Sequence, residues 1–295
     1  MTHRVSVLVV LAAASTAFAQ EKVDIRPGVK AGSKITRTTD IEGAGTMSLD
    51  SGGVKKDFET TMATGETAAE EVLEAKAGRP VKLRRFYHRK LSTFKVPAAD
   101  REDRTDSSLT GRVLTVTNRD GKTSSTCDDP NVDPKDLARE GMNDEWDFPL
   151  DSGRPVGAGD EWEPDAKLVK AWSEGRRRKL EEAKLKCRLA EFTEAAGQRC
   201  ARIEVELASK GTTAASEKSP EQKIEWTLKG SVWFGLEAGR VVKFELEGGL
   251  KLEWDTAPPG RAAEHWTNIL KLTMKGTSTP GEAAFEKRPG EESDK

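Results

Sequence analysis

The sequence predicts an all-β (β-dominated) fold, built as a long, curved antiparallel sheet or half-barrel. Apolar and polar side chains alternate through most of the 295 residues, the period of a strand with one buried face. Glycine-containing turn signals separate the alternating segments, and one short segment carries a helix signal. We therefore expect about ten strands and one short linking helix.

The first 19 residues have the pattern of a Sec-type signal peptide. Arg4 supplies the positive charge, an apolar core follows, and Ala17-Phe18-Ala19 is a small-x-small cleavage site. The apolar core is too short to anchor the chain in a bilayer. The sequence thus predicts an exported protein, periplasmic or secreted after cleavage near Ala19.

Charge and hydropathy limit the kinds of partner that the protein is expected to have. The 48 basic residues are balanced by 50 acidic ones, for a formal net charge of −2, so no nucleic-acid partner is expected. No later stretch approaches the ~20 apolar residues of a membrane helix, so no membrane span is expected.

Residues 20–276 are predicted to form a single β-rich domain, and the charged, Pro- and Gly-containing residues 277–295 a disordered tail. Ala77-Gly78-Arg79 recurs as Ala238-Gly239-Arg240, and Val29-Lys30-Ala31-Gly32 resembles Val156-Gly157-Ala158-Gly159. Two repeated halves, 29–126 and 156–276, would explain both matches. Chance recurrence of Gly-Arg turns in a β protein explains them equally well.

The clearest predicted hairpin pairs residues 224–236 with 242–254. Its apolar residues all fall on even positions in both arms, which places Gly230 opposite Gly248. Keeping both apolar sets on one face requires a loop with an odd number of residues and Gly239 in the left-handed conformation.

The helix signal lies between the halves. Asp133 can cap a helix, Pro134 suits its first position, and the helix would run to about Asn143. Asp129, Asn131 and Asp133 also have the spacing of a calcium loop, with Glu140 at the twelfth position. Pro134 stands where that loop needs glycine, so we expect no metal site.

Cys127, Cys187 and Cys200 are an odd number, so at most one internal disulfide can form. Strand parity places Cys187 and Cys200 on opposite faces, which disfavours that pair without a bulge. The disulfide state stays open at this point.

The signal peptide, the Gly-entry strand, the Gly-Arg turns and the Trp-rich second half resemble exported bacterial proteins of unassigned function. The long curved hairpins with a linking helix also resemble the periplasmic lipoprotein-carrier half-barrels, which hold acyl chains in an apolar concavity. This second resemblance is one of topology over residues 29–276. It implies an apolar or lipid-like ligand and transfers no functional residue to this chain.

No nucleophile elbow, zinc-protease motif or phosphate-binding loop is present. His88 lies in a basic strand and His265 is expected to point outward, so neither suits a catalytic triad. We expect no enzymatic activity and no cofactor.

The aromatic residues of the predicted hairpin are either core or a wall for a ligand. The candidate ligand-binding residues on the even face are Trp226, Phe234, Phe244, Leu246 and Trp254. Trp233 falls on the other face and is a candidate exposed contact. The sequence favours an exported, non-enzymatic binding or carrier protein for an apolar or amphipathic ligand. The alternative is a structural or interaction module of the cell envelope with no small-molecule ligand.

Overall fold

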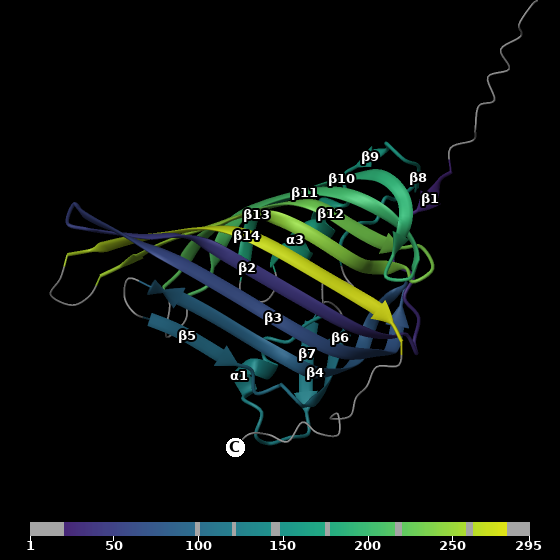
Figure 1. Cartoon of the computed structure of the whole chain (residues 1–295), viewed down its shortest axis with the longest axis horizontal. Helices are drawn as coiled ribbons and strands as arrows, with labels where there is room; N and C mark the ends of the chain where they lie inside the picture. The colour runs from purple at the N-terminus through teal and green to yellow at the C-terminus, as the bar shows by residue number, and fades with distance from the viewer. Residues whose placement is uncertain are drawn as a thin grey trace, which may run out of the picture.

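The computed structural model describes residues 21–97, 101–119, 122–142, 148–174, 178–215, 220–257 and 262–281. An antiparallel sheet of twelve strands curls through the molecule, which confirms the predicted fold class (Figure 1). The predicted signal peptide lies outside the described residues. Of the predicted tail, Thr277 to Pro280 belong instead to the last strand.

The first half of the chain contributes β1 (Val23–Asp24), β2 (Lys34–Ser51), β3 (Val54–Lys76), β4 (Arg79–Val96), β5 (Arg101–Asp106), β6 (Val113–Arg119), β7 (Lys122–Cys127) and α1 (Pro134–Leu137). The second half contributes β8 (Pro155–Val156), β9 (Glu161–Trp162), α3 (Ala166–Glu174), β10 (Arg178–Ala195), β11 (Gln198–Thr213), β12 (Gln222–Gly235), β13 (Arg240–Thr256) and β14 (Glu264–Pro280).

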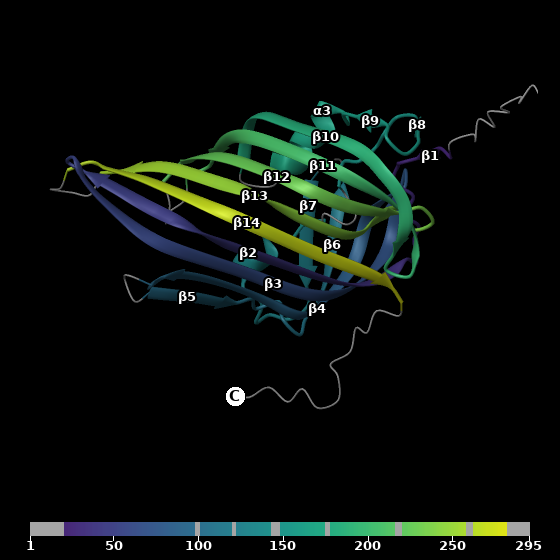
Figure 2. The same cartoon turned by 45° about the horizontal axis from the view of Figure 1, so that its top comes forward.

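Two wings make up the sheet. One has the order β7-β6-β4-β3-β2, with β5 beside β4, and the other has the order β14-β13-β12-β11-β10-β9. The pairing of β14 with β2 joins the wings and runs from Glu264↔Ser51 to Pro280↔Ile35. Figure 2 shows the convex outer side of the sheet in front, with α3 and β7 behind it.

The predicted hairpin forms as β12 and β13, and its even positions share one face, as expected. The predicted register is wrong by two residues, because Gly230 pairs with Leu246, and Gly248 with Leu228. The loop is also not odd. It holds the four residues 236–239, and a β-bulge that skips Val242 restores the common face. Gly239 has the predicted left-handed conformation, with φ of 60°.

Two helices are described, where the sequence predicted one. The Asp133 cap is confirmed, since its Oδ1 accepts a hydrogen bond from the Lys135 N–H at 2.7 Å. However, α1 ends at Leu137 and does not reach Asn143. The second helix, α3, was not predicted; it follows Asp165, whose side chain also caps the backbone.

The core has two main parts, both on the inner face of the sheet. Beneath β10–β13, the segment 148–174 contributes Phe148, Leu150, Trp162 and Val169 to a large apolar cluster. A smaller cluster around Leu83, Tyr87 and Leu114 lies beneath β3, β4 and β6. The segment that links the halves therefore fills part of the curl of the sheet.

Residues 25–29 form a strap across one end of the molecule. The Gly28 N–H donates to the Gly239 carbonyl and the Val29 N–H to the Gly78 carbonyl, both at 2.9 Å. The two similar Ala-Gly-Arg turns, one in each wing, thus meet the same short segment. Whether the halves arose by duplication stays a prediction.

We predict that Gly239→Ala destabilises the protein more than Gly197→Ala. Both glycines have positive φ, but a Cβ at Gly239 would lie 2.3 Å from Gly28 Cα, whereas Gly197 has open space around it. The positive φ costs about 1–2 kcal/mol at either site, and the collision with the strap adds to it at Gly239. Urea unfolding of the two variants checks this, and equal losses would contradict the strap contact.

Candidate ligand-binding face

The inner face of the sheet carries the apolar side chains, and the pairing register shows how they adjoin. One row runs from β12 to β3 through Leu228, Gly248, Leu272, Gly43 and Met62. Large side chains alternate with glycines in this row. A Cβ on Gly43 would lie 2.7 Å from Met62 Cγ and 2.8 Å from Leu272 Cδ2, so these neighbours cover the glycine.

Three of the predicted ligand-binding residues lie in the covered part of this face. Phe234, Phe244 and Leu246 are buried in the large apolar cluster together with Phe148 and Leu150. In this structure they pack against the segment 148–174. They form the closed, proximal half of the inner face, next to the strap.

The inner face is different beyond Gly248, towards the turn at residues 52–53 and the ends of β13 at Thr256 and of β14 at Glu264. Apolar side chains continue there and belong to neither main core cluster. Ile224 and Leu270 are buried, and the others are half-buried. We call the half-buried set the distal face. Its members are Met47, Leu49, Phe58, Leu250, Leu252, Trp254 and Trp266.

Trp254 is the predicted ligand residue that falls on the distal face. It pairs with Trp266 across β13 and β14, and the two rings stack with centroids 5.9 Å apart and planes 2° from parallel. Trp226 lies at the border between the two halves, half-buried, with the Arg178 guanidinium 4.9 Å from its ring. The register therefore places Trp254 on the distal face and Trp226 at its border, where Trp226 packs against the large apolar cluster.

Trp233 projects from the outer face, as predicted, and is half-buried beneath the Lys243 ammonium at 4.4 Å from its ring. His265 is exposed, also as predicted, with Nδ1 2.8 Å from Asp255 Oδ1. His88 is half-buried and packs edge-to-face on Phe86.

The three cysteines are free thiols. Cys187 pairs in register with Val205, and Cys200 pairs with Thr193, so the two sulfurs do not meet. Burial raises the pKa of the Cys187 thiol, which disfavours the reactive thiolate.

A buried ionic cluster, which the sequence pattern did not predict, lies between the two core regions. Glu70 Oε1 accepts hydrogen bonds from Arg85 Nε at 2.5 Å and from Arg37 Nε at 3.1 Å. Arg37 also pairs with Glu66. Arg37, Glu70 and Arg85 are at most 1% exposed, so these charges are shielded from water.

Glu140 connects the loop after α1 to this cluster. Its carboxylate accepts from Arg85 Nη1 at 2.6 Å, from Lys90 Nζ at 2.8 Å and from the Tyr87 hydroxyl at 2.8 Å. The residue at the twelfth position of the calcium-like spacing thus holds the loop to β4. Among the described residues, no group of three or more His, Cys, Asp or Glu could hold a metal ion.

The pKa values in the cluster follow from burial and charge. Burial opposes ionisation of Glu66, but attraction to Arg37 and Lys90 outweighs it and lowers the pKa of Glu66 to about 2. The pKa of Glu140 is also lowered, because Arg85 and Lys90 outweigh its burial. Burial raises the pKa of Tyr87 to about 12, so its hydroxyl stays protonated and donates.

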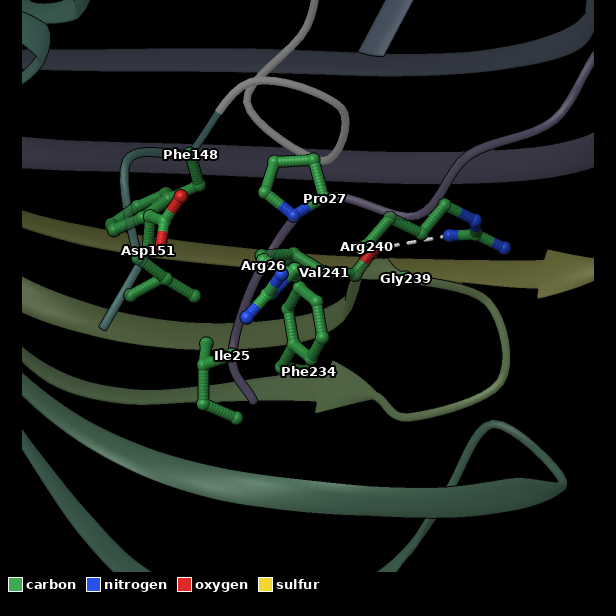
Figure 3. A pocket seen from close by; sticks show the side chains of 10 residues that line it. Ile25, Arg26, Pro27, Phe148, Asp151, Phe234, Gly239, Arg240 and Val241 are labelled. Carbon is green, nitrogen blue, oxygen red and sulfur yellow. Dashed lines mark hydrogen bonds between the residues drawn. The ribbon is translucent and has the colours of Figure 1, made fainter. Parts of the chain in front are cut away.

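Figure 3 shows a small pocket between the strap, residues 148–151 and the β12–β13 turn. Phe234, Phe148 and Ile25 line its apolar side. It has room for about one water molecule, so it is too small for a lipid-like ligand.

The comparisons with known proteins give little. No family model and no curated protein matches the chain. A solved structure titled "Lipid-protein interactions in lipovitellin" is similar over 89% of this chain, with 7% identity and a TM-score of 0.39. The chain spans only 28% of that one. A DUF1329 family protein from Desulfovibrio piger is similar over 84% of this chain and 89% of its own, with 9% identity and a TM-score of 0.14. Among the described residues, no helix is long and apolar enough to cross a membrane.

We predict that Glu140→Gln lowers the free energy of unfolding by about 3 kcal/mol, because it leaves the buried Arg85 without its full partner. Glu247→Gln is the matched control. Glu247 pairs with Lys229 at 3.3 Å on the exposed surface, where removing the charge should cost under about 1 kcal/mol. Urea titration measures both, and equal effects would mean that the cluster does not stabilise the fold.

We also predict acid sensitivity from Glu66. Because its folded pKa is lowered to about 2 from an ordinary 4.5, its contribution is complete above pH ~5 and is lost as the pH falls towards 2. Glu66→Gln should therefore flatten the loss of stability between pH 5 and 2, measured by urea unfolding at each pH. If the free energy of unfolding falls between pH 5 and 2 as steeply in this variant as in the parent protein, the cluster does not lower the pKa of Glu66.

Proposed function

We propose that the protein is an exported, non-enzymatic carrier whose distal face binds the apolar part of an amphipathic ligand. One observation carries the proposal. The distal face presents half-buried apolar side chains from β2, β3, β13 and β14 that lie outside both main core clusters. The covering segment 148–174 packs instead against the proximal half.

Such a surface is costly unless something covers it. Apolar area exposed to water loses roughly 25 cal/mol per Å² relative to burial, and contiguous apolar patches mark sites of interaction. The inner side of a curved sheet offers contact from several strands at once, which suits a long flexible chain. The stacked Trp254 and Trp266 add a flat, rigid aromatic contact at the hairpin end.

The proximal half has a different role in this proposal. Its closed packing, together with the strap and the ionic cluster, holds the curve of the sheet while the distal face stays available. The closed packing of Phe234, Phe244 and Leu246 also favours the alternative, an envelope module whose sheet packs only on its own segments. Binding to the distal face separates the two.

We predict that Leu252→Glu abolishes binding of the apolar fluorescent probe phenylnaphthylamine and leaves the fold intact. Leu252 lies on the distal face, where a carboxylate keeps contact with water. Ile269→Glu is the matched control, since Ile269 lies on the outer face of the adjoining strand and is 53% exposed. Probe fluorescence and thermal melting report binding and folding separately.

Leu246→Glu should behave differently from Leu252→Glu. Leu246 is 4% exposed, so its replacement buries an unpaired carboxylate and should cost several kcal/mol, on the order of half the ~5–15 kcal/mol of a typical domain. Failure of the parent protein to bind the probe would contradict the carrier and leave the envelope module.

A further inference from the structure

Three polar side-chain atoms in the distal region of the inner face have no hydrogen-bond partner within the part of the chain that the structure describes. They are Asn268 Oδ1, Thr60 Oγ1 and Trp226 Nε1. Asn268 is 6% exposed and Thr60 is 1% exposed, so water does not satisfy them either. A buried polar atom left without a partner costs roughly 1–3 kcal/mol, and each such atom calls for an explanation.

The register places all three in adjoining rows of the distal region. Asn268 lies on β14 between Leu252 of β13 and Met47 of β2. The next row runs across the strands from β12 to β3 and consists of Trp226, Leu250, Leu270, Gly45 and Thr60. The unpartnered atoms therefore lie within or beside the distal face.

The surroundings of Asn268 and Thr60 are uncharged, and the Arg178 guanidinium lies over Trp226 at the far end of the second row. The inner-face neighbours of Asn268 and Thr60 in these two rows, from β12 to β3, are Ile224, Trp226, Leu250, Leu252, Leu270, Gly45, Met47 and Phe58. None of these side chains ionises. A charged ligand group placed here would lose its hydration without gaining a counter-charge, so the site suits a neutral polar group.

The orphaned atoms also specify hydrogen-bonding roles. Asn268 Oδ1 is an acceptor and requires a donor from the ligand. The Thr60 hydroxyl serves in either role, so it can donate to an acceptor of the same ligand group. Trp226 lies four strands from Thr60, which is too far for its Nε1 to bind that group as well. An ester has acceptors only, whereas an amide has both an N–H and a carbonyl.

We propose that the carried ligand is an acyl chain linked through an amide, and that this amide binds between Asn268 and Thr60 on the distal face. This inference rests on the proposed carrier function and names its ligand class. The acyl chain extends over the apolar members of the distal face. The charged part of an amphipathic ligand lies beyond these two rows, towards solvent.

The spacing agrees with this assignment. Asn268 and Thr60 lie on strands separated only by β2, so their backbones are roughly 12 Å apart, given ~4.8 Å between strands and ~3.4 Å per residue. Two side chains pointing inward from that separation leave room for one small polar group. Gly45, directly across from Thr60, has no side chain, and the backbone of β14 at Ile269 and Leu270 lies close against it. Met47, beside Asn268, is a flexible side chain that can move aside for a ligand.

The test compares two probes of equal chain length, N-methyl palmitamide and methyl palmitate, by displacement of phenylnaphthylamine from the full exported protein. We expect the amide to bind about tenfold more tightly than the ester. Asn268→Leu and Thr60→Val, which keep the shape of each side chain, should each reduce that preference, and the double variant should abolish it. Thr273→Val, on the exposed outer face of β14, is the matched control and should leave it unchanged.

Stability gives a second, independent readout. Without ligand, Asn268→Leu should raise the urea midpoint, because it removes a buried atom that lacks a partner. A lowered midpoint would overturn the inference, since it would mean that Asn268 is satisfied within the fold. Equal binding of amide and ester by the parent protein would overturn it too, while leaving the carrier function standing. Failure to bind either probe would overturn the carrier function itself.

Discussion

The unbroken pairing of β14 with β2 is the constraint on which the rest of the structure depends. From Glu264↔Ser51 to Pro280↔Ile35 no bulge interrupts it. The alternation of inward-facing and outward-facing side chains in one wing therefore continues unchanged into the other. Side chains alternate strictly between faces, and this ladder therefore decides which residues of both wings point inward. Residues that are far apart in the chain therefore lie on the same inner face, such as Asn268 and Thr60, or Leu246 and Glu66.

A sheet that curls over so many strands must fill or expose its inner side, and this chain treats it in three ways. Under β10–β13 the segment 148–174 fills it with apolar side chains. Near β2–β4 a cluster with three cationic and three carboxylate side chains fills it, tied to the loop after α1 by Glu140. Such a cluster adds little net stability over an apolar core, but losing one member costs several kcal/mol, roughly 3–5. At the distal end, side chains stay half-buried, and the proposed site lies there.

The period-two pattern was enough to predict the fold class, the inner face of β12 and β13, and the turn at Gly239. It could not predict the register, because the bulge at Val242 keeps both apolar sets inward with an even loop. The helix at Pro134 started as its cap indicated but stopped early, and nearby Glu140 is drawn to Arg85 and Lys90 from β4. For α3, the Pro164-Asp165 pair before it is a helix-start signal from which the helix could have been predicted.

The candidate site could be predicted only in part from the alternation of apolar and polar residues. Parity identified Trp226 and Trp254 as inward-facing, but it does not distinguish a covered position such as Phe244 from an open one such as Leu252. That distinction depends on where the segment 148–174 packs. The ionic cluster was hidden because its members come from four separate parts of the chain. Glu66 and Glu70 do share the parity of Ala68, which was a sign of buried charge.

Native mass spectrometry of the protein, purified without detergent, tests the central claim most directly. A carrier with an open distal face should retain part of its cargo, giving a species heavier than the polypeptide by the mass of one amphipathic molecule. That species should disappear in Leu252→Glu and persist in Ile269→Glu. A spectrum with the polypeptide mass alone, unchanged after incubation with an acylated amide, would contradict the account.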